Sequence, residues 1–113
     1  MKPIPLAAPK RDLEECQEAM ESAWLEVLHE GVFVGGPSVS AFEEYFASFC
    51  GVQYCVAVAN GTDAIAISLR ALGVNLGDEV VTVANAGGYT TSACHILGAK
   101  PVYVDIDPST LQI

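Results

Sequence analysis

The sequence predicts an α/β fold, in which helices at the N-terminus precede a parallel sheet of alternating strands and helices. From residue 54 to residue 105, apolar runs of strand length alternate with longer segments of helical periodicity, in the order β-α-β-α-β. Apolar strands joined by crossover helices form parallel sheets with right-handed connections. Glycine-rich turns follow the first two strands, at the edge of the sheet where such folds bind ligands.

Residues 1–53 are expected to form an extended arm, two helices and a glycine loop. Three prolines disfavour regular structure over residues 1–10. Asp12 is the expected N-cap of a helix over residues 12–29, because apolar residues recur there at steps of three and four. Three glycines and a proline end that helix and form a loop over residues 31–37.

The second helix is expected to begin with the capping box Ser40-Ala41-Phe42-Glu43. It runs to about Cys50 and ends at Gly51, a residue type that accepts the left-handed conformation found after many helices. Four aromatic residues share one face of this helix, and packing into a core is the expected role of that face: Phe42, Tyr45, Phe46 and Phe49.

An apolar run over residues 54–59 predicts a buried strand, and a mostly buried helix is expected from Thr62 to Gly73. Between them, Gly61 allows an anion to approach the backbone, and the Thr62 hydroxyl can donate a hydrogen bond. Free amides and the dipole of a helix N-terminus make such a turn an anion site. An ordinary helix start with a threonine or aspartate as N-cap is the alternative that these residues leave open.

Two further strands are expected over residues 80–83 and 100–105, on either side of a helix capped by Thr90 or Thr91. A second glycine turn, over residues 85–88, follows the first of these strands. Both glycine turns then lie at the carboxyl edge of one parallel sheet. This convergence favours a phosphate as the bound group.

The charge of the chain excludes several kinds of partner. Its formal net charge is −9, from 14 acidic and 5 scattered basic residues, which is no footprint for a nucleic acid or an anionic membrane. Hydrophobic residues make up 51% of the chain, so we expect apolar surface to be covered by a partner subunit or further sequence. No signal peptide or membrane-spanning run is recognised, which predicts a cytoplasmic protein.

The four cysteines are expected to be reduced, buried thiols of a cytosolic protein. No two of them have CxxC spacing, and neither histidine has ligand spacing to a cysteine. We therefore predict no metal site.

Several motifs in this order resemble the DegT/StrS-type sugar aminotransferases: the G-x-F-x-x-G-P loop, the F-E-x-x-F-A helix, the N-G-T-D-A turn, G-D-E-V and V-D-I-D-P. The resemblance covers residues 4–113. It implies the aspartate aminotransferase fold, with residues 54–113 as the first, incomplete part of the large domain that binds pyridoxal 5'-phosphate (PLP). It further implies a homodimer, a nucleotide-linked keto-sugar as substrate and glutamate as amino donor.

The resemblance also assigns residues to the cofactor. Gly61, Thr62 and Asp63 match the family segment that holds the PLP phosphate. The family usually places an aromatic or histidine side chain against the pyridine ring, at the position that is Gly87 in this sequence. Tyr89 is the candidate to supply that ring instead, and packing onto the core at the start of a helix is its alternative role.

The loop over residues 31–37 matches a family segment near the active-site entrance and the dimer contact. Phe33 would line the sugar pocket or touch the second subunit there. A buried plug within the loop is the alternative role of this side chain.

No lysine of this chain matches the family residue that forms the Schiff base with PLP. The lysines are Lys2, Lys10 and Lys100, and Lys100 falls at the start of a strand, opposite the site. The family aspartate that pairs with the pyridine nitrogen also has no match. We therefore expect the N-terminal portion of an aminotransferase, inactive alone and without a catalytic residue of its own.

Two alternatives stay open. One is a PLP-dependent sugar dehydratase of the same family, in which a histidine takes the Schiff-base position. The other is a short non-catalytic protein that binds PLP or phosphate, or docks on a full-length relative. A nicotinamide-binding unit is excluded, because the turn lacks the G-x-G-x-x-G pattern.

Overall fold

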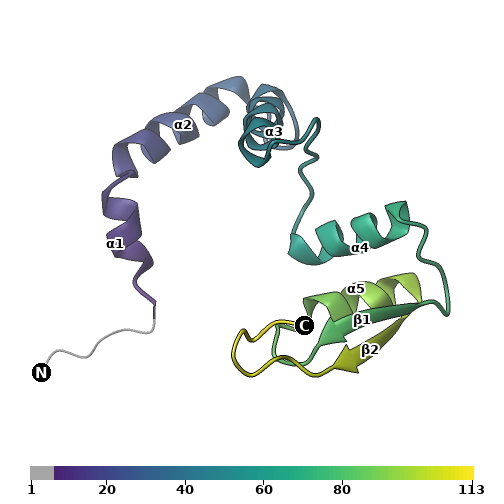
Figure 1. The fold of residues 1–113 in the computed structure, drawn as a ribbon. Coiled ribbons are helices and arrows are strands. Elements are labelled where there is room, and N and C mark those ends of the chain that lie inside the picture. The colour runs from purple at the N-terminus through teal and green to yellow at the C-terminus, as the bar shows by residue number, and fades with distance from the viewer. Residues whose placement is uncertain (1–6) are drawn as a thin grey trace, which may run out of the picture. The chain divides into compact units, whose positions relative to one another are not determined.

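An extended segment joins two units of the chain, which divide between Val56 and Ala57. The computed structural model describes residues 7–113, and each unit is treated by itself (Figure 1). The expected extended arm lies outside the described residues as far as residue 6, and the helix that begins at Pro9 replaces its last two residues.

The N-terminal unit begins with two helices, α1 (Pro9–Glu14) and α2 (Gln17–Glu30). The expected single helix over residues 12–29 is therefore wrong, and so is Asp12 as its N-cap, since α1 starts with Pro9 in its first turn. The helical conformation is interrupted at Cys16, whose thiol lies 3.7 Å from the Leu13 carbonyl oxygen. The Cys16 amide also bonds that oxygen at 3.1 Å, which closes a tight turn in place of a continuous helix.

Helix α3 (Pro37–Cys50) starts three residues before the expected capping box. Pro37 occupies the first turn, where its missing N–H costs nothing, and Gly36 is the N-cap with φ 85°. Ser40 is consequently an interior residue, and its amide donates to the Gly36 carbonyl at 3.1 Å. The expected helix end is confirmed, because Gly51 takes the left-handed conformation with φ 69°.

The aromatic residues of α3 pack along the helix rather than in a core. The rings of Phe42 and Phe46 stack with centroids 5.5 Å apart, and Phe46 and Phe49 follow at 6.1 Å. The three side chains stay 54%, 41% and 75% exposed, respectively. The expectation that this face is buried is thus wrong for the described chain, which offers no apolar surface that covers it.

The C-terminal unit holds two helices and two strands, which are α4 (Gly61–Ala71), β1 (Glu79–Val83), α5 (Tyr89–Leu97) and β2 (Lys100–Val104). The strands are parallel, and α5 forms the crossover between them. Helix α5 lies between the sheet and α4 (Figure 1), and it contacts α4 and both strands. This arrangement confirms the α/β class and the parallel sheet of the sequence analysis.

The expected strand over residues 54–59 is not formed, so the order β-α-β-α-β is reduced to α-β-α-β. Tyr54 and Val56 are each 76% exposed. A strand is held by the ladder of a neighbouring strand, and β1 pairs only with β2 within the part of the chain that the structure describes. An apolar composition is therefore not sufficient to make this segment a strand, because it has no partner strand to pair with among the described residues.

Helix α5 begins at Tyr89 with Gly88 as its N-cap, so the expected caps Thr90 and Thr91 are both wrong. The Thr91 hydroxyl instead lies 2.6 Å from the Tyr103 hydroxyl. That hydrogen bond joins α5 to β2, and it uses the oxygen that a capping role would need.

The buried apolar residues of residues 7–113 are all small: Ala47, Ala66, Ala93, Cys94 and Ala99. Cys94 and Ala93 are completely buried on α5, where small side chains let the helix approach the sheet and α4 closely. Many large apolar side chains are exposed to solvent; for example, Trp24 is 59% exposed and Val81 is 56% exposed. Surface of this kind is typical of interaction sites.

The expectation of four buried thiols is only partly correct. None of the four cysteines forms a disulfide bond, which agrees with reduced thiols. Cys94 is buried and Cys55 is half-buried, but Cys16 and Cys50 are exposed because they lie at helix ends with little chain packed over them.

The turn after β2 is organised by Asp107. One carboxylate oxygen accepts hydrogen bonds from the amides of Ser109, at 2.7 Å, and Thr110, at 3.2 Å, and from the Ser109 hydroxyl. These bonds lower the pKa of Asp107, the Ser109 hydroxyl most strongly. The Asn85 side chain also donates to the Leu111 carbonyl at 3.4 Å, which ties this turn to the loop after β1.

The lowered pKa of Asp107 predicts that acid opens this turn. The carboxylate stabilises the turn fully above the unfolded pKa, and this contribution is lost as pH falls through the lower folded value. In an NMR titration, the Ser109 and Thr110 amide shifts should change with a midpoint below the ordinary value of 3.8. The Asp107→Asn variant should abolish this transition, whereas a midpoint at or above 3.8 would contradict the assignment.

Candidate functional site

The predicted cofactor residues lie at one end of the C-terminal unit. Gly61, Thr62 and Asp63 form the first turn of α4, and Tyr89 is the first residue of α5. Both helix starts lie at the same end of the unit as the arrowheads of β1 and β2 (Figure 1). Lys100 begins β2, so it lies at the opposite end, as the sequence analysis expects.

Asn60 shapes the start of α4. Its side-chain carbonyl accepts a hydrogen bond from the Asp63 amide at 3.0 Å, and its side-chain amide donates to the Asp63 carboxylate at 2.9 Å. Asn60 is therefore the N-cap, and Thr62 lies inside the helix. Asn60 was not among the predicted residues, although asparagine is a favoured N-cap and the acidic Asp63 follows it at the three-residue spacing of a capping box.

Two amides at the start of α4 have no acceptor within residues 7–113. The Asp63 amide bonds the Asn60 side chain and the Ala64 amide bonds the Asn60 carbonyl at 3.0 Å, which leaves the N–H groups of Gly61 and Thr62. The Thr62 hydroxyl likewise has no hydrogen-bond partner among these residues. Free amides, a hydroxyl and the positive end of a helix dipole are the groups with which proteins bind anions, so these residues could hold one.

Gly61 keeps the approach to these amides open. A Cβ atom at this position would meet no atom within 4 Å, and the residue is exposed. The turn is therefore open at Gly61, as an anion site requires. The phosphate of a cofactor fits this turn in both donor chemistry and space.

Asp63 stabilises the turn at the start of α4, and its amide is not one of the free hydrogen-bond donors there. Its amide and its carboxylate are both bonded to Asn60. The carboxylate also interacts favourably with the positive end of the α4 dipole. Asp63 therefore fixes the geometry of the capped turn in which Gly61 and Thr62 stand free.

Tyr89 lies against the glycine loop that follows β1. Its amide donates to the Gly87 carbonyl at 2.7 Å, and its side chain is 64% exposed. The ring stands over Gly87, since a Cβ there would lie 2.9 Å from Cδ2 and still closer to Cε2. Within the described chain, no hydrogen bond or ring contact joins Tyr89 to the start of α4.

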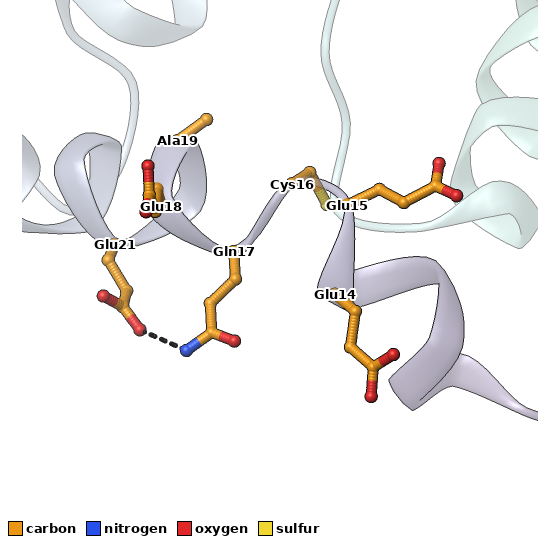
Figure 2. A pocket seen from close by; sticks show the side chains of 7 residues that line it. All are labelled: Glu14, Glu15, Cys16, Gln17, Glu18, Ala19 and Glu21. Atoms are coloured by element: carbon orange, nitrogen blue, oxygen red, sulfur yellow. Dashed lines mark hydrogen bonds between the residues drawn. The ribbon is translucent and has the colours of Figure 1, made fainter.

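An acidic hollow lies at the junction of α1 and α2 in the N-terminal unit. Figure 2 shows its lining, and the four carboxylates point in different directions: Glu14, Glu15, Glu18 and Glu21. The Gln17 side chain donates to Glu21 at 2.8 Å. No group of acidic, histidine or cysteine side chains among residues 7–113 can hold a metal ion, so this hollow is no metal site.

None of the helices in the described part of the chain is both long and apolar enough to cross a membrane.

Comparison with known protein families identifies the chain. Residues 14–113 match the sequence profile of the DegT/DnrJ/EryC1/StrS aminotransferase family. The chain belongs to this family. The match includes the α4 turn and the glycine loop before α5, so the site geometry lies within the family region.

Two relatives with assigned reactions are similar over most of the chain. The UDP-2-acetamido-2-deoxy-3-oxo-D-glucuronate aminotransferase of Pseudomonas aeruginosa is 41% identical, over 92% of this chain and 29% of that enzyme. The 3-oxo-glucose-6-phosphate:glutamate aminotransferase of Bacillus subtilis is 44% identical, over 78% of this chain and 20% of that enzyme. This chain thus spans less than a third of the length of either relative.

Solved structures of the family share the fold. NtdA from Bacillus subtilis, solved with its cofactor PMP bound, superimposes with a TM-score of 0.90 at 37% identity, over 97% of this chain and 26% of that chain. DesV from S. venezuelae, solved with a ketimine intermediate, superimposes with a TM-score of 0.89 at 32% identity, over 95% of this chain and 29% of that chain. The chain therefore has the fold of part of these aminotransferases.

The capping geometry predicts that Asn60 stabilises the C-terminal unit. The Asn60→Ala variant loses the acceptor for the Asp63 amide and should lower the free energy of unfolding by about 1 kcal/mol. Urea denaturation followed by circular dichroism measures this change. The matched variant Asn60→Ser keeps an N-cap oxygen and should retain most of the stability, so equal losses in both variants would refute the capping role.

Proposed function

We propose that the intact protein, of which these 113 residues supply part of the cofactor site, is a PLP-dependent aminotransferase that converts a nucleotide-linked keto-sugar into an amino sugar. The observation that carries this proposal is the family match over residues 14–113. The two relatives described above are named for sugars with a 3-oxo group, which supports a 3-oxo sugar as substrate. The name of the second relative includes glutamate, which supports glutamate as the amino donor.

The start of α4 would hold the cofactor phosphate. Gly61 and Thr62 offer two free amides and one hydroxyl, and Gly61 leaves room for a phosphate to approach. Asp63 would act by fixing the turn through Asn60. PLP, when bound, supplies an electron-withdrawing ring that stabilises negative charge on the substrate carbon. The role of this chain is to bind and orient the phosphate end of that group.

Tyr89 would contact the cofactor ring. Its side chain begins α5 at the same end of the unit as the phosphate donors, and 64% of it is exposed. An aromatic ring packed against a pyridine ring contributes about 0.5–1.5 kcal/mol beyond the area it buries. Because position 87 carries no side chain, Tyr89 is the aromatic residue in this loop that can make such a contact.

The exposed apolar loop after α2 supports a homodimer. Phe33 is 65% exposed and Val34 is 92% exposed, so Phe33 is not a buried plug of its own loop. We propose that Phe33 contacts the second subunit or lines the sugar pocket, because exposed apolar clusters are typical of interaction surfaces. We also propose a cytoplasmic location, which is supported by the absence of a disulfide among the four cysteines, because thiols stay reduced in that compartment.

The test of the proposed function is a coupled assay on the intact protein, purified as the cell makes it. PLP is added, and its absorbance is followed on binding. A UDP-linked 3-oxo sugar and glutamate are then supplied, and mass spectrometry follows the sugar product. An amino sugar with equimolar 2-oxoglutarate supports the proposal. A dehydrated sugar supports the dehydratase alternative, and a protein that binds no PLP refutes both.

The free Thr62 hydroxyl predicts a specific loss of phosphate affinity. The Thr62→Val variant keeps the shape of the side chain but removes a hydrogen bond to a charged group, so PLP should bind about ten- to a hundredfold more weakly. Fluorescence titration with PLP measures the dissociation constant. Thr62→Ser should restore most of the affinity.

The control for this prediction lies on the same helix. Ser68 is an exposed hydroxyl residue further along α4, so Ser68→Ala should leave PLP affinity unchanged. If Thr62→Val and Ser68→Ala bind PLP equally well, the Thr62 hydroxyl does not contact the phosphate.

A further inference from the structure

The backbone conformation of Gly87 does not explain why this residue is a glycine. Seven glycines within residues 7–113 have positive φ values, which L-residues with a side chain rarely adopt. Gly87 is not among them. Its φ value therefore does not require a glycine, and the surroundings of the residue offer another reason for the absence of a side chain.

The space above Gly87 supplies that reason. A Cβ atom at this position would lie 2.9 Å from Cδ2 and 3.2 Å from Cζ of Tyr89, and closer still to Cε2. Non-bonded carbon atoms pack at about 3.5–4.0 Å, so a side chain at position 87 and the observed ring exclude each other. The neighbouring Gly88 is different, because a Cβ there would meet nothing within 4 Å.

Burial does not hold the Tyr89 ring in this place. The side chain is 64% exposed, and the short bond from its amide to the Gly87 carbonyl fixes only the backbone. A residue larger than glycine at position 87 would therefore displace the ring into solvent at little cost. The orientation of the ring depends on the empty space over Gly87.

We propose that Gly87 is a positioning residue, which lets the Tyr89 ring lie over the loop at the carboxyl end of β1. The proposal rests on the proposed function, in which that ring contacts PLP. Position 87 and position 89 then act as a pair, because the loop accommodates one side chain over its backbone and not two. Gly87 touches neither cofactor nor substrate in this arrangement and acts only through Tyr89.

The first experiment follows the ring without any cofactor. The protein is labelled with 3-fluorotyrosine, and the Tyr89 signal in the fluorine NMR spectrum is assigned by its loss in Tyr89→Phe. The Gly87→Ala variant should shift this signal, whereas the matched variant Gly88→Ala should leave it in place. The melting temperature of Gly87→Ala should stay close to that of the unmodified sequence, since an exposed ring can move aside.

The second experiment measures binding. Gly87→Ala should weaken PLP binding by about two- to tenfold, the range expected when an aromatic contact is lost. Its affinity for inorganic phosphate should stay unchanged, because the start of α4 is untouched. In a Tyr89→Ala background, adding Gly87→Ala should weaken PLP binding no further, since the ring that it displaces is already gone.

The outcomes separate this inference from the proposed function. If the unmodified protein binds no PLP, the proposed function is refuted. If it binds PLP but Gly87→Ala and Gly88→Ala give the same fluorine spectrum and the same affinity, the positioning role is refuted and the proposed function stands. Additive effects of Gly87→Ala and Tyr89→Ala on PLP affinity would also refute the pairing.

Discussion

The candidate site depends on one constraint, which is that the first amides of a helix have no acceptor within that helix. At the start of α4, Asn60 satisfies the amide of Asp63 with its side chain and that of Ala64 with its backbone. The amides of Gly61 and Thr62 are left over. A cap that satisfied every donor would stabilise the helix but leave nothing for an anion, so partial capping links the local fold to the proposed chemistry.

Close packing of α5 brings the rest of the site to the same end. Ala93 and Cys94 are completely buried, which places this helix tightly between the sheet and α4. Because β1 and β2 are parallel and α5 is the crossover, both strands end where the helices begin. The Thr91–Tyr103 hydrogen bond fixes α5 on β2, and Tyr89 begins the same helix.

The sequence predicted the end of α3 and the parallel sheet, but it missed the start of α3 and wrongly predicted a strand over residues 54–59. Gly51 ends α3 as expected, since a left-handed C-cap is a local property. The start of that helix was missed because Pro37 competes with the Ser40 capping box, and sequence gives no ranking of the two. Residues 54–59 have the composition of a strand, but pairing needs a partner. The role of Gly87 was also hidden, because it depends on where a ring lies in space.

Burial differs sharply among the cysteines, so the reactivity of one thiol can report on the packing of the C-terminal unit. Cys94 is completely enclosed on α5, whereas Cys16 and Cys50 on the other unit are open. A thiolate reacts only when solvent reaches it. Alkylation of Cys94 must therefore wait until α5 separates from its neighbours, so the rate of that modification reports the opening of the layers that carry the site.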